Sequence, residues 1–96
     1  MDIKTLKRLQ DIKKEHGLND NLIMLIFHLG SNKIDTFRDM IEKGIVPENT
    51  RCFRDLSPRL RLFVDTWREG GPITVTHKAQ LTNKGSFIYK KLTLIN

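Results

Sequence analysis

The residues best suited to recognise another molecule are the cations of one segment with helical spacing, residues 57–69. On a helical wheel, Arg61 and Arg68 emerge on one flank, Arg59 on the other, and Thr66 faces outward. Arginine can donate two hydrogen bonds to guanine, and threonine can contact a phosphate or the thymine methyl group. The spacing therefore indicates contact with DNA, with an amphipathic helix that carries ordinary surface arginines as the alternative.

Side chains arranged for catalysis are not indicated. The sequence contains no G-x-S-x-G elbow, no G-x-x-x-x-G-K-[ST] phosphate loop and no H-E-x-x-H zinc motif. His16, His28 and His77 fall in three separate expected elements. Cys52 has no sequence neighbour that would activate its thiol, so packing is its expected role. We therefore expect a protein that is not an enzyme, with no catalytic residues, no metal site and no cofactor.

The composition suits a polyanionic partner. We expect the 96 residues to form a single domain spanning 1–96. The chain has 17 Lys and Arg residues against 11 Asp and Glu residues, a net charge of +6, and such an excess favours binding to nucleic acid. Its single cysteine permits no intramolecular disulfide, and its apolar runs are too short for a membrane span or a signal peptide. We therefore expect a cytoplasmic protein without a membrane partner.

Three helices are predicted in the first half of the chain. Residues 2–16 repeat apolar side chains every three positions among many lysines, which predicts a basic N-terminal helix. Residues 21–29 are apolar on nearly all sides, which predicts a buried helix that ends at Gly30. Residues 33–43 have an apolar face at helical spacing, which predicts a third helix that ends at Gly44.

The helix expected over residues 57–69 has signals at both ends. Ser57 is a suitable N-cap, and Pro58 follows at the first helical position. The glycine pair at Gly70 and Gly71 predicts where the helix ends.

A hairpin and a last helix are predicted beyond these glycines. The β-rich residues 73–76 and the residues 80–82 predict two strands, with a turn at His77–Lys78 between them. Residues 84–92 predict a closing helix. A strand over residues 87–95 is the alternative, because apolar and polar side chains also alternate there in part.

The stretch LRLFVDTWREGGPITVTHKAQLTNKGSFIYKKL resembles the second half of a winged helix-turn-helix DNA-binding domain. Residues 81–85, LTNKG, fit the Leu-Thr-x-x-Gly motif that leads into the closing helix of that family. The resemblance implies a mainly α fold with a small β-hairpin (α+β). It implies four to five helices and a two- or three-stranded antiparallel wing. The winged-helix-like core would span residues 20–92, after a basic N-terminal helix at 2–16.

The resemblance also implies a function. The helix at 57–69 would enter a DNA major groove, and the wing would touch a neighbouring phosphate or the minor groove. The chain would then be a transcriptional regulator that binds double-stranded DNA, with residues 2–16 as the contact of a homodimer. The expected nucleic-acid-binding residues are Arg59, Arg61, Thr66, Arg68, His77, Lys78 and Lys84.

Two other functions fit the sequence. The first is a protein–protein interaction module, an adaptor or inhibitor of a larger nucleic-acid-processing machine, with Leu62 and the N-terminal helix as contacts. The second is binding to RNA or to single-stranded DNA, in which Trp67 and Tyr89 would stack on bases. Steep salt dependence of binding to duplex DNA distinguishes the expected function from the first of these.

Overall fold

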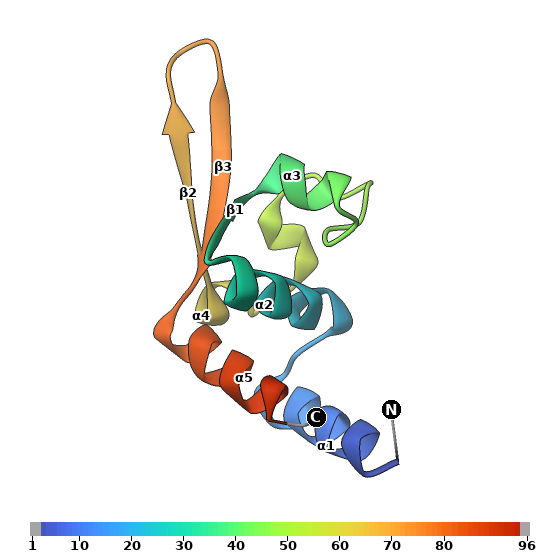
Figure 1. Cartoon of the computed structure of the whole chain (residues 1–96). Coiled ribbons are helices and arrows are strands. Elements are labelled where there is room, and N and C mark those ends of the chain that lie inside the picture. Colours follow the sequence, from blue (N-terminus) through green and yellow to red (C-terminus); the bar gives the residue numbers. More distant parts are fainter. Residues whose placement is uncertain (1–2, 95–96) are drawn as a thin grey trace.

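The structure, a computed structural model, describes residues 3–94. A body of helices carries a three-stranded antiparallel sheet, two strands of which rise from the body as a long arm (Figure 1). The elements in chain order are α1 (Ile3–His16), α2 (Asp20–Asn32), β1 (Ile34–Thr36), α3 (Phe37–Glu42), the 3₁₀ helix η1 (Phe53–Leu56), α4 (Leu60–Phe63), β2 (Val64–Gly70), β3 (Val75–Leu81) and α5 (Asn83–Thr93). The predicted fold class, mainly helical α+β with a small antiparallel sheet, is confirmed, and the arrangement is consistent with the winged-helix description.

The first two helices lie where they were predicted, but α2 does not end at Gly30. Gly17, with φ +67°, ends α1, and the Asn19 side chain caps α2 by accepting a hydrogen bond from the Leu22 N–H at 2.8 Å. Gly30 lies inside α2, against the Tyr89 ring, where a Cβ atom would be 2.1 Å from a ring carbon. The glycine therefore permits close packing between α2 and α5, and the helix continues to Asn32.

The helix predicted over residues 33–43 is a short strand followed by a short helix. Lys33 adopts a positive φ of 63° at the end of α2, and residues 34–36 then pair with β3. Thr36 caps α3, because its Oγ1 accepts a hydrogen bond from the Asp39 N–H at 3.1 Å. The prediction was wrong at its start because pairing with a distant strand outweighs local helical spacing.

The helix predicted over residues 57–69 is also wrong beyond Phe63. Ser57 does open a turn, since its Oγ accepts a hydrogen bond from the Arg59 N–H at 3.1 Å, but α4 covers only Leu60–Phe63. Residues 64–70 form β2, which makes seven cross-strand pairs with β3. Val64, which fits both periods, is buried in the strand as it would be in a helix. The β-branched and aromatic side chains that follow it favour the strand.

The wing consequently turns at a different place from the one predicted. Gly70 pairs with Val75, so the tip is residues 71–74, and His77 and Lys78 lie in the middle of β3 instead of at a turn. Gly70 has φ +130°, and a Cβ atom there would lie 2.2 Å from the Thr74 carbonyl oxygen, so only glycine fits this approach. Pro72 lies in the tip and removes no hydrogen bond from the ladder.

The closing helix is confirmed as α5, and the alternative strand is wrong over its described part, up to residue 94. Ile95, the last residue of that alternative, lies outside the described residues. Thr82 caps α5 by accepting a hydrogen bond from the Gly85 N–H at 3.0 Å. The Leu-Thr-x-x-Gly segment therefore works as a strand-to-helix junction.

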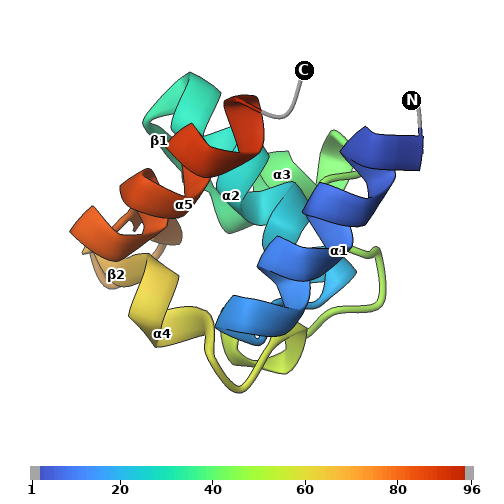
Figure 2. The same cartoon turned by 90° about the horizontal axis from the view of Figure 1, so that it is seen from below.

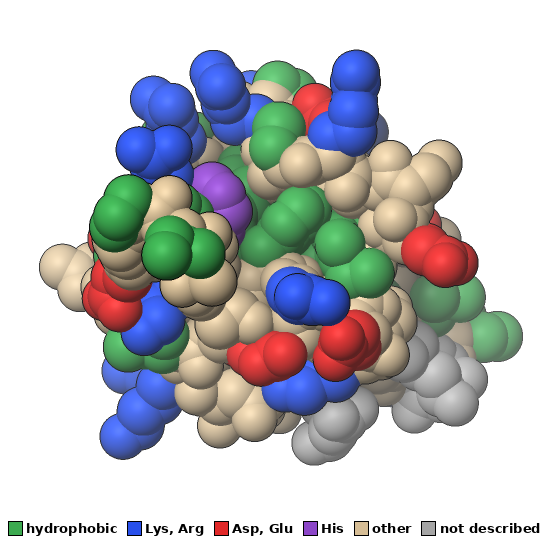
Figure 3. All heavy atoms as spheres, turned by 90° about the horizontal axis from the view of Figure 1, so that it is seen from above, with side chains coloured by type: hydrophobic (Ala, Val, Ile, Leu, Met, Phe, Trp, Pro, Cys, Tyr) green, Lys and Arg blue, Asp and Glu red, His purple; other side chains and the backbone are tan. Residues whose placement is uncertain are grey.

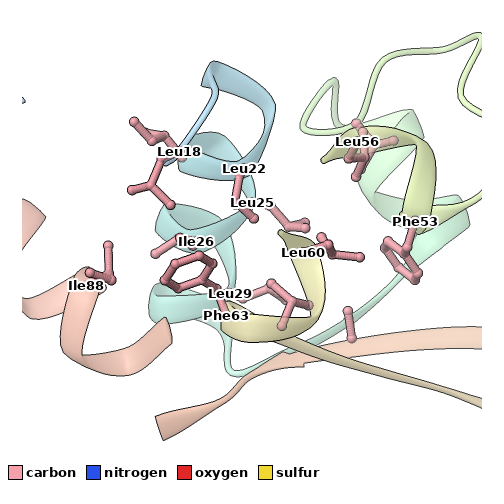
Figure 4. Packing of buried hydrophobic residues seen from close by; sticks show 14 of the residues in the cluster. Leu18, Leu22, Leu25, Ile26, Leu29, Phe53, Leu56, Leu60, Phe63 and Ile88 are labelled. Carbon is pink, nitrogen blue, oxygen red and sulfur yellow. The ribbon is translucent and has the colours of Figure 1, made fainter. Parts of the chain in front are cut away.

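The core surrounds α2, which buries Leu22, Leu25, Ile26 and Leu29 almost completely. Buried side chains of η1, α4 and α5 complete the same cluster (Figure 4). Helix α1 buries no residue fully and contacts the core through its partly buried apolar side chains. It lies at the end of the molecule opposite the arm, where α4 and α5 are also seen (Figure 2). No helix within residues 3–94 combines the length and the apolar character needed to cross a bilayer.

Candidate nucleic-acid interface

A groove of about 370 Å³ lies between the helical segment 53–61 and the arm. Four of the seven residues predicted to bind nucleic acid line it: Arg61, Thr66, Arg68 and His77. Arg54 lines it as well. We call the groove that these five residues line the arginine groove. Seen from above, several lysine and arginine side chains lie along the upper edge, beside apolar side chains at the centre, and others lie nearer the lower edge together with acidic side chains (Figure 3).

Buried apolar side chains set the direction of the arginines in the helical segment. Phe53 and Leu60 are at most 7% exposed and anchor η1 and α4 to the core. Their neighbours Arg54 and Arg61 are exposed and line the groove. The packing of two short helices therefore fixes two guanidinium groups on one side of the body.

Strand alternation sets the direction of the other groove residues. Side chains of directly paired residues in an antiparallel ladder share one face of the sheet. Thr66 pairs with the buried Ala79, and Arg68 pairs with His77, so these positions share the face that carries the core. A one-residue shift of the register would move Arg68 and Thr66 to the opposite face.

The groove arginines are not neutralised by any carboxylate of the described residues. Within residues 3–94, none of Arg54, Arg61 and Arg68 takes part in an ion pair, whereas Arg38 and Arg51 pair with nearby carboxylates. Arginine is always charged and donates from a planar fork that matches phosphate and guanine. The groove therefore presents unpaired, bidentate donors to a bound anion.

The opposite face of the arm has a different chemistry. The Glu69 carboxylate accepts a hydrogen bond from Trp67 Nε1 at 2.8 Å and another from Lys78 Nζ at 2.7 Å. The hydrogen bond from Lys78, followed by that from Trp67, lowers the pKa of Glu69 below its usual value. Lys78, predicted to bind nucleic acid, is thus held by a carboxylate and lies outside the groove.

Two further predicted contacts also lie elsewhere. The Arg59 guanidinium packs over the turn after α1, where a Cβ atom on Gly17 would be 2.6 Å from its Nε. The Lys84 ammonium lies 5.6 Å from the centroid of the Phe63 ring, at the start of α5. The structure therefore does not bring Arg59 or Lys84 into the arginine groove.

The other cluster of titratable groups connects α2, β1 and the end of α3. Asp35 accepts hydrogen bonds from His28 Nε2 at 2.6 Å and from Lys43 Nζ at 2.8 Å. Burial would raise the pKa of Asp35, but the hydrogen bonds from Lys43, His28 and the Thr36 N–H outweigh it and lower that pKa. The described residues include no group of three or more His, Cys, Asp and Glu side chains placed to hold a metal ion. The cluster connects α2, β1 and the residue that follows α3.

Sequence reasoning missed Arg54 and misjudged Cys52. Arg54 belongs to a run with four arginines between residues 51 and 61, and this local density was the available signal. Cys52 is exposed at the groove, whereas packing was the expected role.

Comparisons with protein-family models, with curated proteins and with solved structures find no match to this chain. The interpretation of the arginine groove therefore depends on its own geometry and charge.

Proposed function

We propose that this protein binds double-stranded DNA through the arginine groove and acts as a regulator of transcription without enzymatic activity. One observation carries the proposal: three arginines that form no ion pair within residues 3–94 line one groove with Thr66 and His77, beside a two-stranded arm. Duplex DNA presents a regular array of phosphates, and neutralising them releases counterions. The net charge of +6 acts in the same direction.

Because α4 and η1 are short, the proposed binding differs from that of a protein with a long recognition helix. Helix α4 has four residues and η1 also has four, so neither can lie along a major groove as a long recognition helix does. Binding then depends on guanidinium groups from two short helices and one strand. We expect phosphate contacts to dominate, with base contacts limited to the arginine tips.

A salt titration of duplex binding tests the proposal. It compares the parent protein with two variants, each lacking one of two arginines that lie two residues apart in sequence. Arg61→Ala removes a groove arginine, and Arg59→Ala removes an arginine of the same charge that packs over Gly17. Fluorescence anisotropy should show affinity falling steeply with salt for the parent protein. For Arg61→Ala the slope should be smaller by about one unit, with affinity about tenfold lower at low salt. Arg59→Ala should match the parent. Absent or salt-independent binding by the parent would contradict the proposal.

The single cysteine gives a second readout of the same contact. Cys52 is exposed and lines the groove, so bound duplex should slow its alkylation by a maleimide. Raising the salt concentration should restore the rate of the free protein. Binding without protection of Cys52 would place the DNA on another face.

A protein-interaction role is the second candidate, and α1 favours it. Ile3 is 86% exposed and Leu6 is 47% exposed on this helix, and Leu62 of α4 is 46% exposed. Apolar side chains left in water can be covered by a partner chain or by a second copy through α1. Stoichiometric capture of one protein, together with no affinity for duplex DNA, would favour this role.

A further inference from the structure

The tip of the arm carries apolar side chains and no charge, which the arginine groove does not explain. Residues 70–76 contain no Asp, Glu, Lys or Arg, although such residues make up 29% of the chain. Ile73 is 94% exposed, and Val75, at the last cross-strand pair, is 50% exposed. A wing that only neutralised phosphates would carry its cations here.

The tip is held in a defined shape. The ladder continues without a break to the Gly70–Val75 pair, which leaves four residues to turn the chain. The approach of Gly70 to the Thr74 carbonyl and the fixed φ of Pro72 restrict this turn. An ordered apolar tip loses little conformational freedom when it is buried in a partner.

The tip and two groove residues, Arg68 and His77, lie on the same arm. The Arg68–His77 pair lies two residues before the last pair of the ladder, which places the tip about 7 Å beyond it along the strands. With Arg68 and His77 on phosphates, the tip would reach past the backbone toward the bases. Between base pairs an apolar side chain is removed from water, which phosphates cannot offer.

We propose that Ile73, backed by Pro72, inserts as an apolar wedge between two base pairs from the minor groove and kinks the duplex; this inference rests on the proposed DNA binding. Isoleucine and proline are among the side chains that partially unstack base steps in this way, with kinks of about 20–90°. Arg68 and His77, on the same arm, contact the flanking phosphates while the tip enters.

The test compares an intact 30-base-pair duplex with one that has a central two-nucleotide bulge, both carrying donor and acceptor dyes at their ends. The bulge is already unstacked, so a wedge binds it more tightly. The parent protein should prefer the bulged duplex about tenfold and should raise energy transfer on the intact one.

Ile73→Ser should lose the preference and the rise in energy transfer while keeping its salt-dependent binding to the intact duplex. Ile3→Ser is the matched control, since it removes another highly exposed isoleucine, from α1 at the opposite end of the molecule.

The outcomes separate this inference from the proposed function. Binding of the intact duplex by the parent protein without bending or bulge preference would overturn the wedge and leave the DNA-binding proposal in place. Equal bending by Ile73→Ser would also overturn it. If Ile73→Ser bends DNA as the parent does but loses stoichiometric capture of a protein, the tip belongs to a protein partner instead. No binding to either duplex by the parent would overturn both proposals.

Discussion

The two faces of the β2–β3 arm differ in whether their cations are paired with a carboxylate. Arg68 and His77 form a cross-strand pair on the face that adjoins the groove, and Arg68 has no ion-pair partner within residues 3–94. Lys78 follows His77 directly in sequence, but it lies on the other face and binds the Glu69 carboxylate. The two faces of the same pair of strands therefore carry a free cation, Arg68, and a neutralised one, Lys78.

For the proposed DNA binding, this difference predicts that the position of a cation matters more than the number of cations. Helix α1 carries five lysines and arginines between Lys4 and Lys14, yet they extend from one straight, exposed helix. The arginine groove has three arginines, and three separate elements direct them into one hollow. Convergence lets several donors engage one stretch of backbone at the same time.

The largest expected effect is on DNA affinity. Removing two groove cations with Arg61→Ala/Arg68→Ala should lower duplex affinity about 100-fold at low salt and reduce the salt slope by about two. The double variant Lys78→Ala/Lys84→Ala removes the same charge from positions outside the groove. It should lower affinity at most about threefold, as a general loss of positive field does. Anisotropy titrations at several salt concentrations measure both, and equal losses would mean that net charge alone drives binding.

A stability effect of intermediate size is expected at the third strand of the same sheet. Asp35 on β1 has a side chain that is 9% exposed and holds both His28 and Lys43. Asp35→Asn keeps the size of the side chain but removes the charge. It should lower the free energy of unfolding at neutral pH by about 2 kcal/mol, less than for a fully buried pair because Lys43 is half exposed. Urea unfolding measures the change, and Asp39→Asn on exposed α3 is the control.

The same variant has a defined pH dependence. The pKa of Asp35 in the folded protein is lowered from its usual 3.8, so the folded state binds this proton less readily than the unfolded chain. Its contribution to stability is therefore complete above pH 3.8 and is lost as the pH falls through the lower, folded value. The difference between parent and Asp35→Asn should shrink to near zero in that acidic range. A constant difference from pH 7 down to pH 2 would show that packing, and not charge, explains it.

The sequence predicted the parts of the fold that local signals determine. Helices α1, α2 and α5 combine a continuous apolar period with a cap or a glycine stop, and each lies close to its expected range. Residues 64–70 differ, because Val64 and Trp67 fit a helical stripe with Leu60 and Phe63 as well as they fit a strand. The β-branched and aromatic side chains favour the strand, and the ladder with β3, a contact between distant residues, adds the cross-strand pairing that a helix would lack.

The expectation of a helix over residues 64–70 also explains where the predicted site residues differ from their expected positions. Arg61 and Arg68 were expected on one helix flank, and they do line one groove, but one extends from α4 and the other from β2. Lys78 was expected at a turn, and its position on the outer face follows from a register that residue spacing did not reveal. Which cations are free depends on carboxylates brought close by the fold, such as Glu69.

The smallest expected effect lies on the outer face, where the single tryptophan reports on Glu69. Trp67 donates to this carboxylate, so its fluorescence should change when Glu69 takes up a proton. The midpoint should lie below the usual value of 4.5, because the hydrogen bond from Lys78 lowers the pKa of Glu69. In Lys78→Ala the midpoint should move upward by less than about one pH unit, as expected for an exposed pair. Glu69→Gln should abolish the transition, because it replaces the carboxylate to which Trp67 donates. A midpoint at or above 4.5 in the parent would mean that Lys78 is not held by Glu69 in solution. Lys78 would then be available to a polyanion, and the contrast between the two faces of the arm would weaken.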